Sequence, residues 1–187
     1  MDAFLISIAV VAFAEIGDKT QLLALVLSAK FRRPVPIILG LATATLLNHT
    51  LAGLIGAWIA TTVGPDRMRL ILGIGFIAMA VWSLIPDRYE GQSVPAPRLG
   101  IYGTTLIAFF LLEMGDKTQI ATAALAARYG TLGPVIAGTT LGMLIADVPA
   151  VLLGKVAAER IPLRIVRGIA AVIFALLGVI LLGHFGG

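Results

Sequence analysis

Two charged heptapeptides stand out in this sequence, EIGDKTQ at residues 15–21 and EMGDKTQ at residues 113–119. Each carries two carboxylates three residues apart, which on a helix share one face, with a glycine between them and a lysine directly after. Both lie inside long apolar runs, where one ionised side chain costs about 2.5–3.5 kcal/mol on insertion scales. This cost falls on Glu15, Asp18, Lys19, Glu113, Asp116 and Lys117. It predicts a functional site at the two motifs.

The motif acids predict a site for a divalent cation. If the two copies meet at one depth, four carboxylates converge, those of Glu15, Asp18, Glu113 and Asp116. Oxygen ligands of this kind suit hard cations such as Ca²⁺, Mn²⁺ and Mg²⁺. Four carboxylates and two lysines sum to −2, which one divalent cation neutralises. Without the cation, crowded carboxylates take up protons, which is the physical basis of cation/proton exchange.

Other polar residues near the motifs are weaker candidates. Lys19 and Lys117 are candidate charge partners, and the purely structural alternative pairs each with the glutamate four residues before it. A shift of 98 residues lays one motif on the other and also lays Asp147 on His49. Both residues could relay protons or hydrogen-bond between helices. The candidates for additional ligands or a relay are Gln21, Gln119, Thr20, Thr118, Asn48 and Asp147.

The composition places these motifs in a membrane. Of the 187 residues, 59% are hydrophobic and only 13% are charged, whereas soluble domains average about 25% charged residues. The basic residues are scattered between apolar runs rather than clustered with aromatics, which argues against nucleic acid as a partner. The chain has no cysteine, which excludes disulfides and thiolate metal sites.

The apolar runs predict an all-α membrane protein with six transmembrane helices. A spanning helix needs about 20 apolar residues, and the candidates are residues 4–29, 36–63, 68–86, 99–127, 132–154 and 163–183. Their continuous hydrophobicity excludes the alternating pattern of barrel strands.

A polar segment divides the six spans into two repeats. Residues 1–86 form the first three-helix repeat, residues 87–98 a cytoplasmic linker, and residues 99–187 the second repeat. Because three spans are an odd number, the second repeat runs opposite to the first. Inverted repeats are typical of secondary transporters, which bind substrate near the bilayer midplane between the repeats.

The basic residues predict the orientation. Nine lysines and arginines fall on one side and three on the other, which places the first side in the cytoplasm and both termini outside. The nine are Lys30, Arg32, Arg33, Arg88, Arg98, Lys155, Arg160, Arg164 and Arg167, and the three are Arg67, Arg69 and Arg128.

The paired E-x-G-D-K-T motif resembles that of the Gdt-type cation/proton antiporters, formerly uncharacterised protein family 0016, which include transmembrane protein 165. The resemblance covers practically the whole chain. It implies exchange of Mn²⁺ or Ca²⁺ for protons, with Glu15, Asp18, Glu113 and Asp116 as cation ligands. The chain is similar to compact bacterial members, for which manganese efflux across the cytoplasmic membrane is the expected role.

The sequence therefore predicts a transporter that exports Mn²⁺ for protons by alternating access, with no cofactor and with the lipid bilayer as its surroundings. A Ca²⁺/H⁺ antiporter would use the same acids. A passive divalent cation channel, the alternative from another class, usually needs a symmetric ring around a continuous pore. An enzyme is not expected, because no HExxH motif is present and His49 has no histidine partner for zinc.

Overall fold

The computed structural model describes residues 1–85, 99–153 and 163–183, and every regular element in these residues is an α-helix. This part of the chain therefore confirms the prediction of an all-α protein. The predicted linker at residues 87–98 lies outside the described residues. The helices are α1 (Asp2–Glu15), α2 (Lys19–Phe31), α3 (Pro34–Thr62), α4 (Pro65–Ser83), α5 (Gly100–Glu113), α6 (Lys117–Tyr129), α7 (Leu132–Leu153) and α9 (Leu163–Gly183).

Two of the predicted spans consist of two helices each. The apolar segment at residues 4–29 contains α1 and α2, the one at residues 99–127 contains α5 and α6, and both are interrupted inside the repeated motif. Gly17 has a φ of 83° and Gly115 a φ of 75°, a left-handed conformation that favours glycine. The prediction that the two acids of each motif share one helical face is wrong, because the helix ends between them.

Three helices of the described residues are long and apolar enough to cross a membrane: α3, α7 and α9 from Arg164 onward. Helix α5 is apolar but has only 14 residues. At about 1.5 Å per residue, such a helix is shorter than the hydrocarbon core of about 30 Å. The short helices that flank each motif therefore cannot cross a bilayer individually.

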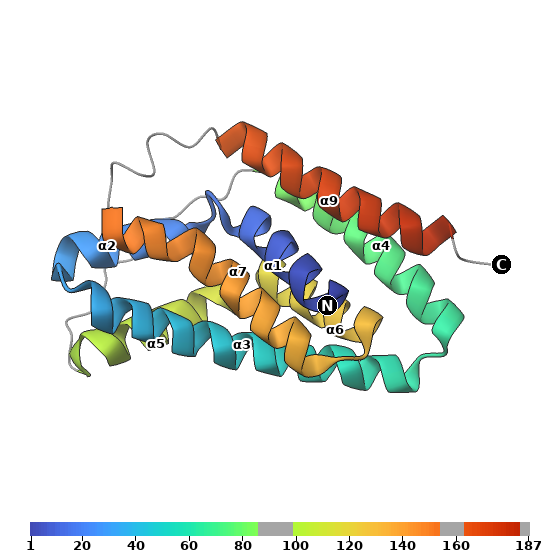
Figure 1. Cartoon of the computed structure of the whole chain (residues 1–187), viewed down its shortest axis with the longest axis horizontal. Helices are drawn as coiled ribbons and strands as arrows, with labels where there is room; N and C mark the ends of the chain where they lie inside the picture. Colours follow the sequence, from blue (N-terminus) through green and yellow to red (C-terminus); the bar gives the residue numbers. More distant parts are fainter. Residues whose placement is uncertain (86–98, 154–162, 184–187) are drawn as a thin grey trace.

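Helices α3 and α7 pack together and run in opposite directions along the long axis of the molecule (Figure 1). Helix α1 packs on α7, and α5 packs on α3, which are equivalent pairs under the 98-residue shift. A Cβ atom at Gly138 would lie 2.5 Å from Phe4 O, and one at Gly40 would lie 2.8 Å from Tyr102 O. Glycine at these two equivalent positions therefore permits the same close helix approach in both halves.

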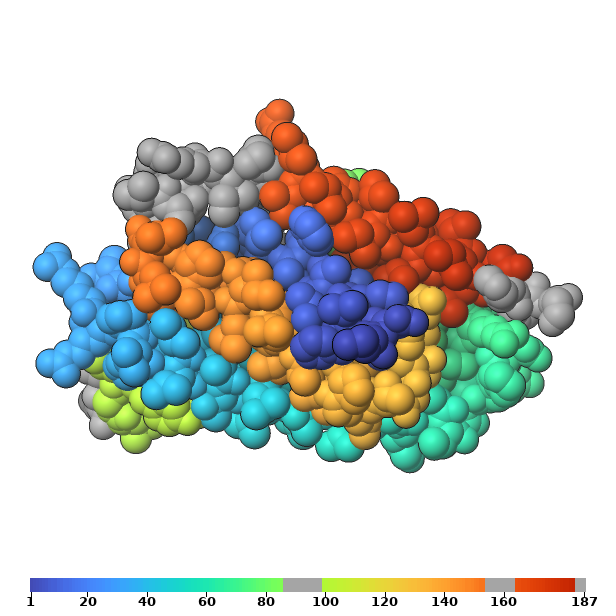
Figure 2. All heavy atoms as spheres, viewed as in Figure 1, coloured from blue at the N-terminus to red at the C-terminus, as the bar shows by residue number. Residues whose placement is uncertain are grey.

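Helices α4 and α9 form a pair at one side of the molecule (Figures 1 and 2). They cross at Gly73 and Gly178, where a Cβ atom on Gly178 would lie 2.9 Å from Gly73 O. Helix α9 also packs on α1, and α4 packs on α6. The equivalent pairs, α4 with α5 and α9 with α2, form no comparable interface within the described residues.

The hydrophobic core consists of two clusters at opposite ends of α7. One joins the beginning of α7 to α1, α4, α6 and α9, and contains Phe76 stacked on Phe174 with ring centroids 6.2 Å apart. The other joins the end of α7 to α2, α3 and α5 around Phe109. Because α1 belongs to the first cluster and α2 to the second, the polar motif lies between two apolar cores.

Candidate functional site

Local hydrogen bonds close both motif breaks in the same way. The backbone N–H of Asp18 donates to Glu15 O at 2.9 Å, and that of Asp116 donates to Glu113 O at 3.1 Å. Each break therefore leaves a glutamate at the end of one helix and an aspartate at the N-cap of the next. The positive end of a helix dipole favours a carboxylate at the N-cap.

The glutamine of each motif supports the turn. The backbone N–H of the motif glycine donates to the glutamine Oε1, at 3.0 Å for Gln21 and 2.6 Å for Gln119. The Nε2 of Gln21 then donates to Ala146 O at 3.0 Å, and that of Gln119 to Asn48 Oδ1 at 3.4 Å. Each glutamine thus fixes the shape of its break, and the second lone pair of its Oε1 is not used by these hydrogen bonds.

Three carboxylates, those of Glu15, Asp18 and Asp116, meet between the breaks. Each offers an oxygen within 4.8 Å of the other two. Glu15 is fully buried, and the two aspartates are 1% exposed. Oxygens that bind one Mg²⁺ or Ca²⁺ at about 2.0–2.6 Å lie at most about 4–5 Å apart, so the spacing suits a divalent cation. Acids from both motif copies are required to form this cluster.

Both motif lysines cross to the other copy of the motif. Lys19 Nζ lies 3.1 Å from Asp116 Oδ1, and Lys117 Nζ lies 3.6 Å from Asp18 Oδ1. In the described part of the chain, these ion pairs join each lysine to the aspartate of the other copy rather than to the glutamate four residues before it. The lysine side chains are 24% and 4% exposed, respectively. Two reciprocal ion pairs therefore join the motif copies.

Glu113, the fourth predicted ligand, is held by residues of α3. His49 Nε2 lies 3.0 Å from Glu113 Oε1, and Asn48 Nδ2 donates to Glu113 Oε2 at 3.2 Å. Asn48 Nδ2 also lies 3.1 Å from Phe110 O. The three acids that share the 4.8 Å cluster do not include Glu113. The structure thus brings three of the four predicted acids together and places the fourth against α3.

Glu15 has a different neighbour on α7. Asp147, the counterpart of His49, is fully buried and lies within electrostatic range of Glu15 and Glu113. Within the described residues, no oxygen of Glu15 or Asp147 has a hydrogen-bond partner. His49 on α3 lies beside Glu113, and the equivalent position on α7 carries an acid, Asp147, instead of a histidine.

The two motif threonines have no assigned role in the site. Thr20 and Thr118 are buried in the first turns of α2 and α6, and within the described residues their hydroxyls have no hydrogen-bond partner. Thr122 Oγ1 donates to the backbone carbonyl of Thr118 at 2.8 Å, which concerns the helix rather than the acids.

Sequence reasoning did not assign the contact of His49 with Glu113. The signal was present, because the 98-residue shift aligns His49 with Asp147 and Asn48 with Ala146. These are the positions of α3 and α7 that contact the motif breaks. The alignment cannot show which acid each residue meets, since that depends on how the two halves pack.

Comparison with known proteins places the chain in a family. The family model described as "Divalent cation/proton antiporter GDT1" matches residues 3–91 and 101–185. No solved structure matches the chain.

Relatives match over nearly the whole chain. A protein of Vibrio cholerae named "Putative manganese exporter" is 48% identical, over 95% of this chain and 88% of its own length. The "GDT1-like protein sll0615" of Synechocystis is 32% identical, over 96% of both chains. A rice protein named "GDT1-like protein 3" is 28% identical, over 92% of this chain and 71% of its own length. The two motifs and these matches together show that the chain is an integral membrane transporter of the GDT1 family of divalent cation/proton antiporters.

Proposed function

We propose that this protein exports Mn²⁺ from the bacterial cytoplasm in exchange for protons, by alternating access. The observation that carries the proposal is the buried cluster of Glu15, Asp18 and Asp116, built from both motif breaks. Desolvated carboxylates are costly unless a cation, a proton or a partner neutralises them. A site that accepts either a divalent cation or protons at the same oxygens couples the two.

Manganese is the proposed cargo on two grounds. The ligands are oxygens alone, which suit Mn²⁺, Mg²⁺ and Ca²⁺. The Vibrio cholerae relative bears the name of a manganese exporter. Ca²⁺ is the alternative cargo within the same class. A roomier site would favour it, because Ca²⁺ binds more oxygens at longer distances than Mg²⁺ does. No resident cofactor is needed for either exchange.

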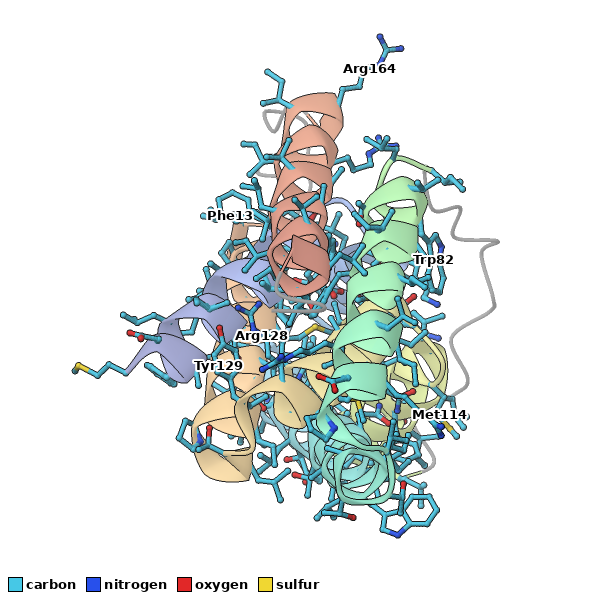
Figure 3. The ribbon with its side chains drawn as sticks, turned by 90° about the vertical axis from the view of Figure 1, so that its right-hand side faces the viewer. Phe13, Trp82, Met114, Arg128, Tyr129 and Arg164 are labelled. Carbon is cyan, nitrogen blue, oxygen red and sulfur yellow. The ribbon has the colours of Figure 1, made fainter. Side chains whose placement is uncertain are left out.

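The proposed topology has six spans in two inverted repeats, with each broken pair of helices forming one span. Helices α1 and α2 contain 14 and 13 residues, together about 40 Å long at 1.5 Å per residue, which suffices to cross the bilayer. Helices α5 and α6 have the same lengths. Broken helices whose ends meet at the midplane are typical substrate sites of inverted-repeat transporters. Both termini then lie outside the cytoplasm, and Arg164, which projects from the beginning of α9 (Figure 3), faces the cytoplasm.

The unequal packing of α4 and α9 supports alternating access. The pair packs on α1 and α6 and forms no comparable interface with α2 and α5 among the described residues. In the proposed topology, α1 and α6 occupy the extracytoplasmic half and α2 and α5 the cytoplasmic half. An inverted repeat has a second state of related geometry, in which these packing relations are exchanged.

Flux measurements in liposomes test the proposal. Purified protein is reconstituted with an imposed pH gradient, and Mn²⁺, Ca²⁺ and Mg²⁺ uptake is followed separately. We expect Mn²⁺ to move against its gradient when protons move down theirs, and a proton ionophore to abolish this movement. An Asp18→Asn variant should be inactive, and Asp66→Asn, at an acid whose side chain is 76% exposed, is the matched control. Mn²⁺ flux that does not depend on the pH gradient would instead indicate a channel.

A further inference from the structure

The motif lysines occupy positions that are electrostatically unfavourable. Lys19 and Lys117 are the first residues of α2 and α6, where the positive end of the helix dipole repels a cation. Lys117 is also 3% exposed, and burial of an ammonium group costs several kcal/mol before its attractions are counted. The ion pairs with Asp116 and Asp18 compensate this cost while the acid cluster holds no other cation.

A divalent cation in the cluster changes that balance. Three carboxylates and two ammonium groups sum to −1, so one divalent cation brings the sum to +1 with the lysines in place. Each ammonium nitrogen lies only 3.1–3.6 Å from an aspartate oxygen that belongs to the cluster. A cation bound to the same oxygen at about 2–2.6 Å would lie close to that ammonium group, and like charges at such distances repel strongly.

We propose that Lys19 and Lys117 are built-in competitors of the transported cation. Each holds the aspartate of the other repeat while the cluster is empty, and each leaves it when a divalent cation binds. This inference rests on the proposed function, because it assigns the cargo to the cluster of Glu15, Asp18 and Asp116. The lysines thereby limit how tightly the cation binds, and they return to the aspartates when it is released.

The two ion pairs differ in how far their lysines are enclosed by the protein. The Lys19 side chain is 24% exposed and that of Lys117 is 4% exposed. Lys19 therefore has room to leave Asp116 in this conformation, while Lys117 is enclosed. Because the two pairs are equivalent under the 98-residue shift, exchange of the two halves would expose Lys117 and enclose Lys19. In each of the two conformations, a different lysine is then the one with room to leave its aspartate.

Lysine labelling in the unmodified protein tests the displacement. Purified protein is treated with a water-soluble, amine-reactive ester at mildly alkaline pH, with and without Mn²⁺, and modified peptides are quantified by mass spectrometry. We expect Mn²⁺ to increase the labelling of Lys19 severalfold. Lys30, exposed in the last turn of α2, is the internal reference and should not change. Sodium chloride at equal ionic strength should have no effect. Labelling of Lys19 that stays constant or falls with Mn²⁺ would overturn the proposal.

Binding measurements with charge variants provide the second test. Titration calorimetry compares the Mn²⁺ affinity of the parent with Lys19→Gln and Lys117→Gln, with Lys30→Gln as the matched control. Removal of a competing charge should tighten binding by about tenfold in each site variant, because the repulsion disappears. Lys19→Arg keeps the charge and should therefore tighten binding less than Lys19→Gln does. Unchanged or weaker binding in both glutamine variants would contradict the inference.

The two tests separate this inference from the proposed function. If the parent shows no proton-coupled Mn²⁺ flux and no Mn²⁺ binding, the proposed function fails. If the parent binds and transports Mn²⁺ but the extent of its Lys19 labelling does not change with Mn²⁺, only the competitor role fails. The labelling experiment also decides the question if either glutamine variant does not fold.

Discussion

The two copies of the motif share six of seven residues, yet their glutamates have opposite surroundings. Glu113 contacts a histidine and an asparagine from α3, whereas neither carboxylate oxygen of Glu15 has a hydrogen-bond partner in the described part of the chain. The difference arises on the facing helices, at His49 and its counterpart Asp147. Sequence repetition in the motif therefore does not make the two half-sites equivalent.

The comparison assigns different tasks to the two glutamates. Glu15 shares the cluster with both N-cap aspartates, so its charge is available to a cation. Glu113 already has partners on α3, and one of them, Asn48, also contacts the backbone of α5 at Phe110 O. We therefore expect Glu15 to act mainly in cation binding and Glu113 mainly in holding α5 against α3.

The largest expected difference is in cation affinity. Glu15→Gln removes one of three clustered charges and should weaken Mn²⁺ binding by about 100-fold, or about 2.8 kcal/mol. Glu113→Gln should weaken it by less than about tenfold. Titration calorimetry on both variants measures the difference, with Asp66→Asn as the surface control. Equal losses in the two glutamate variants would show that the half-sites are equivalent after all.

Thermal stability should change in opposite directions in the two halves. Asp147→Asn replaces a buried acid that lacks a hydrogen-bond partner among the described residues, and should stabilise the cation-free protein by about 1–2 kcal/mol. His49→Ala removes a fully buried side chain that lies 3.0 Å from Glu113, and the cavity left behind should destabilise the protein by about 1–3 kcal/mol. Unfolding temperatures in detergent without divalent cations report both effects. A destabilised Asp147→Asn variant would indicate that this acid has a structural partner.

The glycines at the helix contacts should behave alike in both halves. Gly138→Ala places a methyl group against Phe4 O, and Gly40→Ala places one against Tyr102 O. Each should destabilise by about 1–3 kcal/mol, because two backbones must separate. Gly133→Ala, also on α7 but with no atom within 4 Å of its Cβ position, is the control. Unequal losses of thermal stability at Gly40 and Gly138 would extend the asymmetry from the site to the scaffold.

The smallest effect is expected from the backbone of the second break. Gly115 has a φ of 75° and no atom within 4 Å of its Cβ position, so Gly115→Ala tests conformation alone. It should cost about 1–2 kcal/mol of stability. Gly75→Ala, in α4 and equally open, should instead be neutral or slightly stabilising. The difference in unfolding temperature between the two variants measures the cost of the left-handed conformation at Gly115. Equal unfolding temperatures would show that the backbone of the second break accommodates alanine without this cost.

Much of the site could be predicted from local sequence. The charged motifs in apolar runs indicated where the acids lie, each with a glycine between its two carboxylates. The interruption itself could not be settled from the motif, because glycine serves close helix packing as well as positive φ. The use of Gln21 Oε1 by the turn also depends on that interruption.

The remaining features depend on contacts between distant segments. The crossing of Lys19 to Asp116 requires the two breaks to face each other, and a sequence favours the local pairing with Glu15 equally well. The contact of His49 with Glu113 depends on the packing of α5 and α6 on α3. Such contacts arise from tertiary packing, which motif spacing does not encode.

The one-sided position of α4 and α9 has a consequence for the surrounding lipid. Within the described residues, this helix pair forms no comparable interface with α5 or α2, so in the proposed topology acyl chains would fill the space beside α5 that the pair would occupy in the opposite state. Leu111 and Met114, 63% and 57% exposed, present the apolar surface that these chains would contact, and Met114 lies at the outer side of the molecule (Figure 3). Lipid and the helix pair thus compete for one surface. Acyl-chain length and packing should therefore shift the balance between the two transport states, as a ligand does that binds only one of them.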